Sequence, residues 1–459
     1  MTQKRILIIG GGPTGLGCAW RLKERGCENY LLCEANDYVG GLSASFKDDK
    51  GFTWDVGGHV LFSHYPWFDA LFEQMTQRKY LTHIRTSFIR MMNRYVPYPF
   101  QNNLRYLPEE PLLDCLMGLY KTSLNSERTA PAHFREWLMA VFGEGVARHF
   151  MLPYNDKVWA QPLENMSAEW IAERVSVVDF KRVLSNVILK KDDVSWGPNS
   201  VFRFPEEGGT GAIFNAFLPG LDGHVRLNCS CVEVNTETKT ALFSDGSRES
   251  WDVLVNSAPL DRFVSMLRPA RPDLVEAAKG LVATSGLMLG LGFARPCPSD
   301  KNWVYFPETA NPIYRLTWFS NYSQKNAPDE NHFSLMGEIS YSPHRPADHQ
   351  NAVNAFIRGL IDTGVIEEAW TNDIVSTNVI DVPYSYPVPT LGRNAALRTI
   401  IPALETLGIY SRGRFGLWLY EIGNMDHSVM QGAELVDHLL EGTDQPTIAP
   451  YSFLKGGAS

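Results

Sequence analysis

The sequence predicts an α/β protein in which a Rossmann-like domain, assembled from discontinuous segments, is joined by an inserted helical domain and a domain built on a mixed β-sheet. Three observations predict this class. An apolar run at Ile6–Ile9 leads into a glycine-rich loop, helical spacing fills residues 108–191, and strand-like segments dominate residues 260–391. With 459 residues, the chain exceeds what one hydrophobic core usually supports, so two or three lobes are expected.

The N-terminal segment has the spacing of a dinucleotide-binding unit. Glycines after the first strand let the backbone turn tightly and approach a pyrophosphate, which lies on the N-terminus of the following helix. A second strand then delivers Glu34, whose carboxylate can accept a hydrogen bond from a ribose hydroxyl. A glycine-rich turn of an ordinary α/β domain is the alternative. Because strand, loop, helix, strand and acid fall in register, we predict that the dinucleotide is bound by Gly10, Gly12, Thr14, Gly15 and Glu34.

A second glycine pair, Gly40–Gly41, identifies the dinucleotide. It resembles the second glycine signature of FAD-binding oxidases, where the chain passes the flavin phosphates, and a domain that binds only NAD does not need it. A strand near residues 52–56 then ends on Gly57–Gly58, which indicates that backbone passes close to a large flat group. We therefore expect FAD, held in part by Gly41, Gly57, Gly58 and His59, with His59 at the flavin ring rather than serving only as a loop histidine.

The remainder of the chain changes its patterning twice. Two prolines interrupt regular structure between residues 96 and 103, helical spacing follows to about residue 191, and strands return from about residue 260. A strand at Ile409 and a closing helix from Asp426 return the chain to the first domain. The expected segments are 1–95, 200–260 and 405–445 for the FAD-binding domain, 105–195 for the helical substrate domain, and 96–104 with 261–404 for the mixed-sheet substrate domain.

The composition excludes several classes of function. Acidic residues outnumber basic residues by 51 to 42, and the net charge of −9 argues against a nucleic-acid partner. Arginines that bind an anionic ligand must therefore be gathered locally. The seven cysteines include no Cys-x-x-Cys pair, so neither a metal site nor a disulfide framework is expected. No apolar stretch approaches a membrane span, so we expect a cytoplasmic protein without a membrane partner; the oligomeric state stays open.

Longer strings of sequence carry a family resemblance that runs from end to end. They are Asp55–Val60, Val96–Asn103, Pro153–Asn155, Trp196–Asn199, Phe319–Ser323, and Ser411–Gly416 continuing to Asp426–Ser428. In these strings the chain resembles the eukaryotic-type UDP-galactopyranose mutases. The resemblance implies an isomerase that interconverts UDP-galactopyranose and UDP-galactofuranose through a sugar adduct on N5 of reduced FAD. NADPH or NADH would reduce the flavin from within the substrate cleft, since no second complete nucleotide-binding unit is present.

The same resemblance assigns residues to the substrate. Tyr98, Phe100 and Gln101 fall where the family holds uracil. Arg174 and Arg315 match the family's diphosphate arginines, which suit a leaving group that gathers negative charge. The tyrosines expected to donate hydroxyls to the phosphates are Tyr305, Tyr322, Tyr386 and Tyr420.

Residues at the sugar and the flavin complete the implied site. Asn155, Trp159 and Asn199 would face the sugar, while His59, Arg414 and Asn424 would lie near flavin and galactose. Val232 joins the expected cofactor-binding set. The residues expected to be catalytic are Arg174, Arg315, His59 and Asn199.

Three other functions remain open at this point. A mutase of another UDP-hexose would differ only in a few contacts at Asn155 and Asn199. An FAD oxidase of the amine-oxidase or protoporphyrinogen-oxidase type shares the glycine-rich segments, but it has no need for two arginines and a tyrosine set at a diphosphate. A non-catalytic nucleotide-sugar binding protein would not need Gly57–Gly58 and His59 against a flavin ring.

Overall fold

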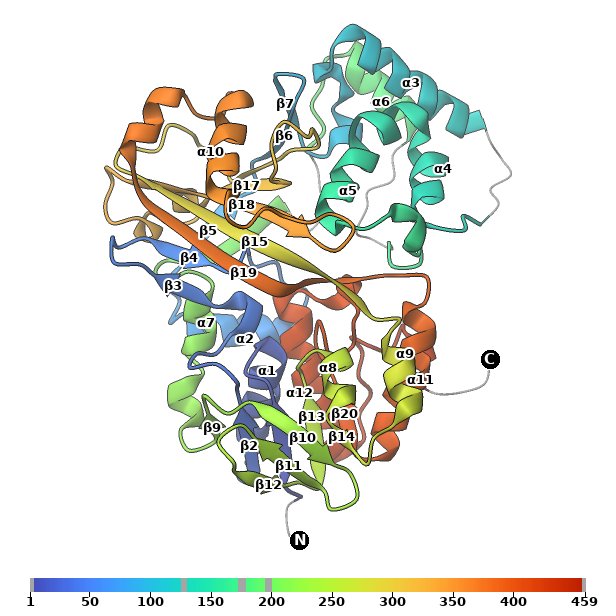
Figure 1. Cartoon of the computed structure of the whole chain (residues 1–459). Helices are drawn as coiled ribbons and strands as arrows, with labels where there is room; N and C mark the ends of the chain where they lie inside the picture. The colour runs from blue at the N-terminus through green and yellow to red at the C-terminus, as the bar shows by residue number, and fades with distance from the viewer. Residues whose placement is uncertain (1–3, 125–129, 172–178, 195–199, 456–459) are drawn as a thin grey trace.

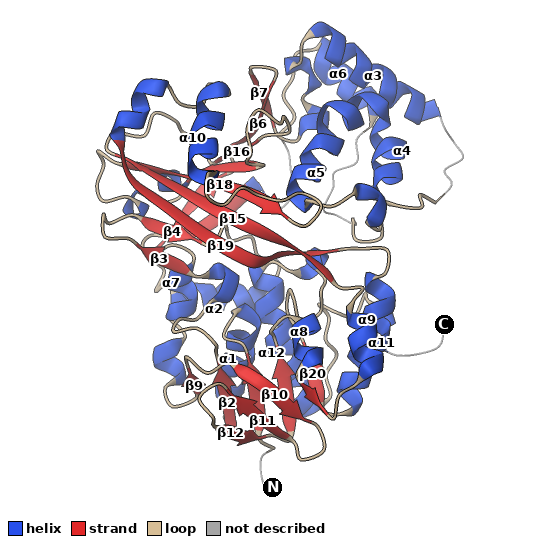
Figure 2. Ribbon diagram, in the orientation of Figure 1, coloured by secondary structure: helices blue, strands red, loops and turns tan. Residues whose placement is uncertain are grey.

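The structure is a computed structural model that describes residues 4–124, 130–171, 179–194 and 200–455. Figure 1 shows a lower half built on a parallel sheet, in which the chain begins, and an upper half crossed by two long strands, β15 and β19. Figure 2 shows helices α3, α4, α5 and α6 gathered at the far end, beyond those strands. The predicted α/β class is confirmed by this arrangement.

Five parallel strands form the sheet of the lower half. Their order is β20 (Ile409–Ser411), β13 (Val253–Asn256), β1 (Ile6–Ile9), β2 (Tyr30–Cys33) and β9 (Val225–Arg226). Every residue of β1 and β13 is buried, as expected for apolar parallel strands covered on both faces. The sheet joins three stretches of chain that are far apart in sequence, as the discontinuous Rossmann-like prediction required.

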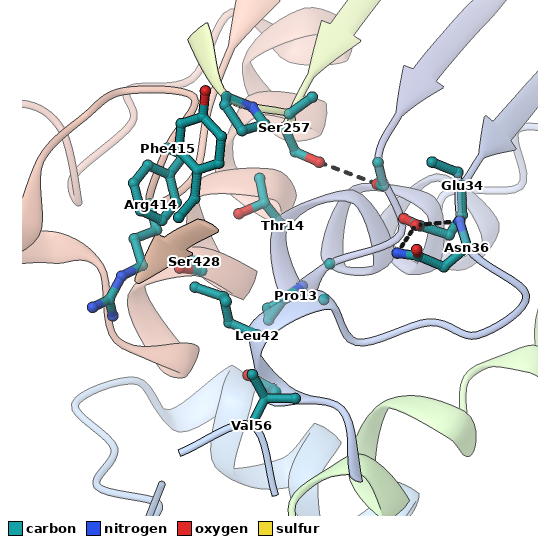
Figure 3. A pocket seen from close by; sticks show the side chains of 18 of the residues that line it. Pro13, Thr14, Glu34, Asn36, Leu42, Val56, Ser257, Arg414, Phe415 and Ser428 are labelled. Atoms are coloured by element: carbon teal, nitrogen blue, oxygen red, sulfur yellow. Dashed lines mark hydrogen bonds between the residues drawn. The ribbon is translucent and has the colours of Figure 1, made fainter. Parts of the chain in front are cut away.

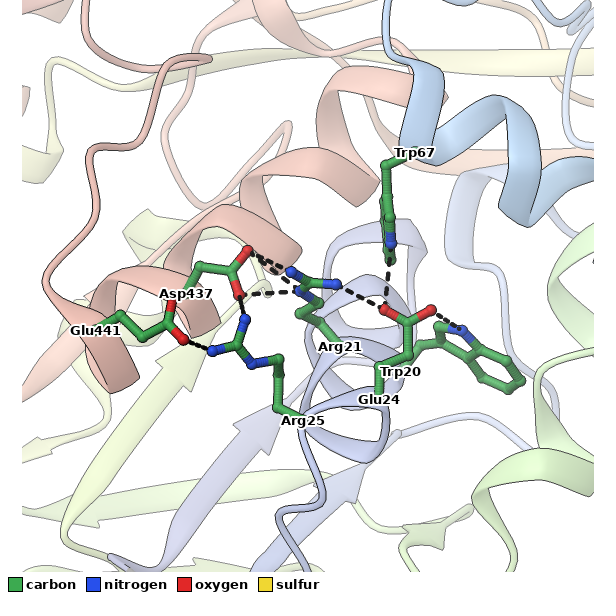
Figure 4. Close-up of polar contacts among 7 residues, drawn as sticks. All are labelled: Trp20, Arg21, Glu24, Arg25, Trp67, Asp437 and Glu441. Atoms are coloured by element: carbon green, nitrogen blue, oxygen red, sulfur yellow. Dashed lines mark hydrogen bonds and ion pairs between the residues drawn. The ribbon is translucent and has the colours of Figure 1, made fainter.

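Helices α1 (Pro13–Glu24) and α12 (Met425–Glu441) pack closely beside this sheet. A Cβ atom at Gly17 would lie 2.5 Å from the carbonyl oxygen of Val429, so the two backbones meet directly. At the surface, Arg21 of α1 and Arg25, directly after that helix, both pair with Asp437 of α12, at 3.0 and 3.3 Å (Figure 4). Each of these partly exposed ion pairs adds little stability, and together they link the end of α1 to α12.

A seven-stranded mixed sheet crosses the middle of the molecule. Its order is β19 (Ile374–Val388), β15 (Val282–Phe293), β18 (Phe333–Tyr341), β17 (Arg315–Trp318), β16 (Trp303–Tyr305), β6 (Ser87–Met91) and β7 (Arg94–Pro97). Strand β6 runs parallel to β16, and the other neighbours are antiparallel. The register places Arg315 directly opposite Glu338, which brings the two side chains into the same site.

The remaining elements complete the two halves. The helices are α2 (Pro66–Met75), α3 (Glu109–Leu124), α4 (Phe134–Val146), α5 (Leu152–Trp159), α6 (Phe180–Ile188), α7 (Gly211–Asn215), α8 (Leu260–Ser265), α9 (Pro272–Ala278), α10 (Ala352–Asp362) and α11 (Arg393–Thr406). The strands are β3 (Ser45–Lys47), β4 (Thr53–Asp55), β5 (Tyr80–Ile84), β8 (Val201–Pro205), β10 (Cys231–Asn235), β11 (Thr240–Phe243), β12 (Arg248–Ser250) and β14 (Leu267–Arg268). None of the helices described has both the length and the apolar character needed to cross a bilayer.

The expected segment boundaries differ from the packing in two places. Strands β6 and β7 belong to the mixed sheet, although the sequence placed residues 1–95 in the FAD-binding domain. Residues of α8, α9 and α11 share one hydrophobic core with β1 and β13, although residues 261–404 were expected in the other domain. The local sequence pattern locates these strands and helices, but it does not show which sheet a strand joins or which sheet a helix covers. The division of the chain into domains stays a prediction.

Candidate active site

A cavity of about 670 Å³ lies between the glycine loop, the carboxyl ends of the parallel strands and strand β19. Figure 3 shows Thr14, Leu42, Arg414 and Phe415 around it. The predicted cofactor residues that line it are Gly10, Gly12, Thr14, Glu34, Gly41, His59, Arg414 and Asn424. Its volume is within the range for a bound organic ligand, and its position outside the carboxyl ends of parallel strands is the usual one in doubly wound sheets.

Two glycines of the first loop have different physical roles. A Cβ atom at Gly15 would lie 1.9 Å from the carbonyl oxygen of Gly10, so this position allows only glycine if the loop is to pack on the helix. A Cβ atom at Gly12 would meet no atom of the described residues within 4 Å, and Gly12 borders the cavity. The loop therefore leaves open space where a pyrophosphate is expected to approach the backbone.

This contrast predicts that two alanine substitutions will have different effects. Gly15→Ala should destabilise the folded chain by about 2 kcal/mol or more, because its methyl group clashes with backbone. Gly12→Ala should keep the wild-type unfolding free energy of the flavin-free chain but bind less FAD. Urea unfolding of the flavin-free chain and flavin absorbance of the reconstituted chain measure the two effects. Equal flavin content in Gly12→Ala and the wild type would contradict the assignment.

Glu34 fixes the loop as well as lining the cavity. Its Oε2 accepts a hydrogen bond from the Gly11 N–H at 2.6 Å, and its Oε1 accepts bonds from the backbone and side-chain nitrogens of Asn36 at 2.9 and 2.8 Å. Figure 3 shows this contact with Asn36. A carboxylate has further acceptor capacity on both oxygens, so these bonds leave room for the predicted ribose contact.

His59 places an unpaired nitrogen in the same region. It lines the cavity, and its buried Nδ1 makes no hydrogen bond within the described part of the chain. Burial, followed by the charges of Arg414 and Arg315, lowers the pKa of His59 to about 4. The imidazole is therefore neutral at ordinary pH and can offer one donor and one acceptor to a bound ring. An orphaned buried nitrogen at this point fits a cofactor with polar edge atoms.

Arg315 is held by a buried acid that the sequence analysis did not identify. Glu338 Oε1 lies 2.7 Å from Arg315 Nε and 2.6 Å from Nη2, and it also accepts the Gly58 N–H at 3.0 Å. Burial opposes ionisation of Glu338, but Arg315, Tyr314 and the Gly58 N–H together hold its pKa below the usual value. Glu338 therefore binds both the Gly57–Gly58 loop, which is expected at the flavin, and Arg315, which is expected at the diphosphate.

Aromatic residues surround this ion pair. Tyr314 donates its hydroxyl to Glu338 at 2.5 Å and lies 3.0 Å from the Tyr386 hydroxyl. Ring centroids are 5.1 Å apart for Tyr98 and Tyr305, and 4.9 Å apart for Trp159 and Tyr420. The Arg414 guanidinium lies 5.1 Å from the Tyr386 ring centroid, which connects the aromatic cluster to the cofactor cavity. The structure thus brings part of the predicted substrate set together, namely Tyr98, Trp159, Tyr305, Tyr386 and Tyr420.

The remaining predicted residues have other surroundings. Phe100 is fully buried and stacks on Phe150 at 4.7 Å, and Gln101 is also buried. Tyr322 packs in a core with Phe202 and Phe204, and Asn155 donates to the backbone carbonyl of Met151, directly before its helix. Of the predicted cofactor residues, Gly15, Gly57, Gly58 and Val232 do not line the cavity, and the Val232 side chain is exposed. Arg174 and Asn199 lie outside the described residues. The roles proposed for all of these residues stay predictions.

Sequence reasoning missed several residues that the fold adds to the site. Ser257 and Ser428 line the cavity, and Glu338 and Tyr314 support Arg315. Ser257 carries no recognisable spacing, whereas Ser428 stands in the family string Asp426–Ser428 without having been assigned a role. Glu338 did leave a signal, because it is a lone acid inside the apolar strand β18, and a buried acid requires a partner.

Comparisons with known proteins agree with this geometry. The family model for flavin containing amine oxidoreductases matches residues 13–368. A crystal structure of reduced UDP-galactopyranose mutase superimposes with a TM-score of 0.94, with 41% identity over 99% of each chain. The chain belongs to the UDP-galactopyranose mutases, within the flavin-containing amine oxidoreductase family.

More distant relatives share with this chain the fold or a part of the sequence. A crystal structure of a putative protoporphyrinogen oxidase from Exiguobacterium has 18% identity and a TM-score of 0.71, covering 96% of the mutase chain and 99% of its own. The 15-cis-phytoene desaturase of Synechococcus elongatus is 35% identical over 71 residues, which span 16% of the mutase chain and 15% of the desaturase. Protoporphyrinogen oxidase 2 of Arabidopsis thaliana is 23% identical over 285 residues, and 53% of its length is covered.

Proposed function

We propose that this chain interconverts UDP-galactopyranose and UDP-galactofuranose, a ring contraction without net change of oxidation state. The observation that carries the proposal is the likeness along the whole chain to reduced UDP-galactopyranose mutase. Reduced FAD, when bound, supplies an electron-rich ring nitrogen as the nucleophile for the anomeric carbon. The cavity beside the glycine loop fits such a dinucleotide, because Gly12 leaves open space and His59 presents an unpaired nitrogen.

The chain's own residues act on the nucleotide diphosphate. Departure of UDP places negative charge on the phosphate oxygens, and a cation held rigidly in advance stabilises that charge without reorganising. Arg315 is such a cation, since Glu338 binds two of its nitrogens. Two bonds to Glu338 leave other N–H donors of the guanidinium for the substrate. The hydroxyls of Tyr305, Tyr386 and Tyr420 are proposed as further donors.

Other parts of the proposal rest on the family resemblance. Arg174 would supply a second cation to the diphosphate, and Asn155, Trp159 and Asn199 would face the sugar. Tyr98, Phe100 and Gln101 would hold uracil. We also place the enzyme in the cytoplasm, because all seven cysteines are free thiols and a reducing compartment maintains that state.

Direct turnover tests the function. Dithionite-reduced protein is incubated with UDP-galactofuranose, and UDP-galactopyranose is followed by chromatography, with oxidised protein as the control. We expect the product only with reduced protein. Conversion that is equally fast with oxidised protein would contradict the proposal, and oxygen-dependent release of hydrogen peroxide from an amine would favour an oxidase.

The reductant is expected to enter the substrate cleft. We propose NADPH or NADH as the electron source, and the Rossmann-like unit at the glycine loop is already assigned to FAD. Saturating UDP should therefore slow reduction of the bound flavin by NADPH in competitive fashion, measured by anaerobic stopped-flow absorbance. Reduction by dithionite serves as the control and should not respond to UDP. Simultaneous, independent binding of UDP and NADPH would contradict a shared cleft.

A further inference from the structure

Two histidines and an aspartate meet outside the cofactor cavity and the aromatic cluster. His64 lies in the loop before α2, and Asp426 and His427 lie in the first turn of α12. His64 Nδ1 is 2.8 Å from Asp426 Oδ2, and His427 Nδ1 is 3.2 Å from Asp426 Oδ1. His64 and Asp426 are 362 positions apart in sequence, so only the fold brings these three side chains together.

The polar atoms of this cluster are incompletely satisfied. Asp426 is fully buried, and although its Oδ1 lies 3.2 Å from His427 Nδ1, neither atom has hydrogen-bond geometry with any partner within the described ranges. A buried anion with an unsatisfied oxygen is costly unless a further partner compensates it.

We propose that His64, Asp426 and His427 form a binding site for a divalent transition metal ion of the zinc type. One candidate ligand atom from each residue lies within 4.8 Å of the others. A tetrahedral zinc ion bound at ordinary bond lengths separates its ligand atoms by about 3.4 Å, so small side-chain movements are enough to close the site. Imidazole nitrogens and a carboxylate oxygen are suitable ligands for this ion.

The ion would occupy a site with an open coordination position. The His64 side chain is 40% exposed, whereas the Asp426 side chain is completely buried, so the cluster has one solvent side and one protein side. Three protein ligands leave a fourth position for water on the solvent side. The sequence analysis expected no metal because it considered only the spacing of the cysteines, whereas this set holds no cysteine and is assembled from two distant segments.

The site lies next to the wall of the cofactor cavity. Asn424, Met425 and Ser428, which flank Asp426 and His427 in sequence, all line that cavity. An ion bound to the loop before α2 and to the first turn of α12 would therefore cross-link two segments beside the cofactor. Binding should raise the melting temperature of the FAD-bound protein. This inference rests on the geometry of the cluster and not on the mutase activity.

Calorimetric titration of the FAD-bound, chelator-treated protein with zinc chloride tests the site. We expect one ion per chain, with the affinity reduced at least tenfold in both His64→Gln and His427→Gln. His438→Gln is the matched control, because His438 lies near the opposite end of α12 and contacts the Thr443 carbonyl oxygen. Cobalt chloride gives a second readout, since a tetrahedral cobalt ion has strong visible absorption that the His64 variant should lose.

Several outcomes would overturn the site. Absence of stoichiometric binding, or equal zinc affinity in the wild type and His64→Gln, excludes it. A lower melting temperature in His64→Gln without zinc binding to the wild type would show that the cluster is only a set of ion pairs. If His427→Gln loses its flavin or its circular dichroism spectrum, the more exposed His64→Gln variant decides the result.

Discussion

Replacing Arg315 with alanine is expected to lower kcat/KM for UDP-galactofuranose by about thirtyfold or more, equivalent to about 2 kcal/mol of transition-state stabilisation. The reason is that the leaving diphosphate gathers charge at a point where Glu338 holds the guanidinium fixed through two nitrogens. The measurement is the rate of UDP-galactopyranose formation by dithionite-reduced variant and wild type, at equal concentrations of bound flavin.

Two control variants separate this effect from damage to the fold. Arg315→Ala leaves Glu338 buried without its cation, and breaking a buried pair can cost about 3–5 kcal/mol in stability. Arg315→Lys keeps a charge near Glu338 but loses the planar fork, so it should recover stability better than rate. Arg358→Ala removes an exposed arginine paired with Asp362 and should leave both unchanged. Wild-type turnover in a folded, flavin-loaded Arg315→Ala protein would exclude Arg315 from the diphosphate site.

Local sequence was sufficient for the features that depend on near neighbours. The strand at Ile6–Ile9, the glycine loop and Glu34 lie within about thirty residues, and their chemistry follows from spacing alone. The structure agrees, since Gly15 admits no side chain and Glu34 binds the loop backbone. The longer strings that carry the family resemblance predicted the fold class of the whole chain, and the similarity to a solved mutase structure confirms that class.

The features that depend on sheet register could not be predicted in this way. Arg315 was identified by resemblance, but its partner Glu338 is set by the pairing of β17 with β18, which no local pattern specifies. Strand β19 was not singled out within the strand-rich region 260–391, although its half-buried and exposed residues alternate over its first eight positions. The family resemblance also does not show which aromatic residues pack together. Resemblance grouped Tyr322 with Tyr386 and Tyr420 as phosphate donors, whereas Tyr322 packs in a different hydrophobic cluster from the other two.

Replacing Lys157 with methionine is expected to reduce the free energy of unfolding by about 3 kcal/mol or more. Lys157 is buried in α5, and its Nζ donates to three carbonyl oxygens between β16 and β17, those of Phe306, Glu308 and Asn311, at 2.7, 3.0 and 2.7 Å. Methionine fills similar space but leaves these acceptors unsatisfied, at about 1–3 kcal/mol each before the saved cost of burying the ammonium is deducted. Urea unfolding measures the difference, and Lys279→Met, at an exposed lysine, is the matched control.

The pH dependence gives an independent check on the same residue. Burial, followed by the charge of Arg345, lowers the pKa of Lys157 from its ordinary value of 10.5 to about 7. Between these two values the unfolded chain binds more protons at this lysine than the folded chain does, so its contribution to stability increases as the pH rises. The stability advantage of the wild type over Lys157→Met should therefore grow from about pH 7 towards pH 10. Lys157 also connects α5 to the segment between Tyr305 and Arg315. If Lys157→Met lost neither stability nor turnover, hydrophobic packing alone would position α5.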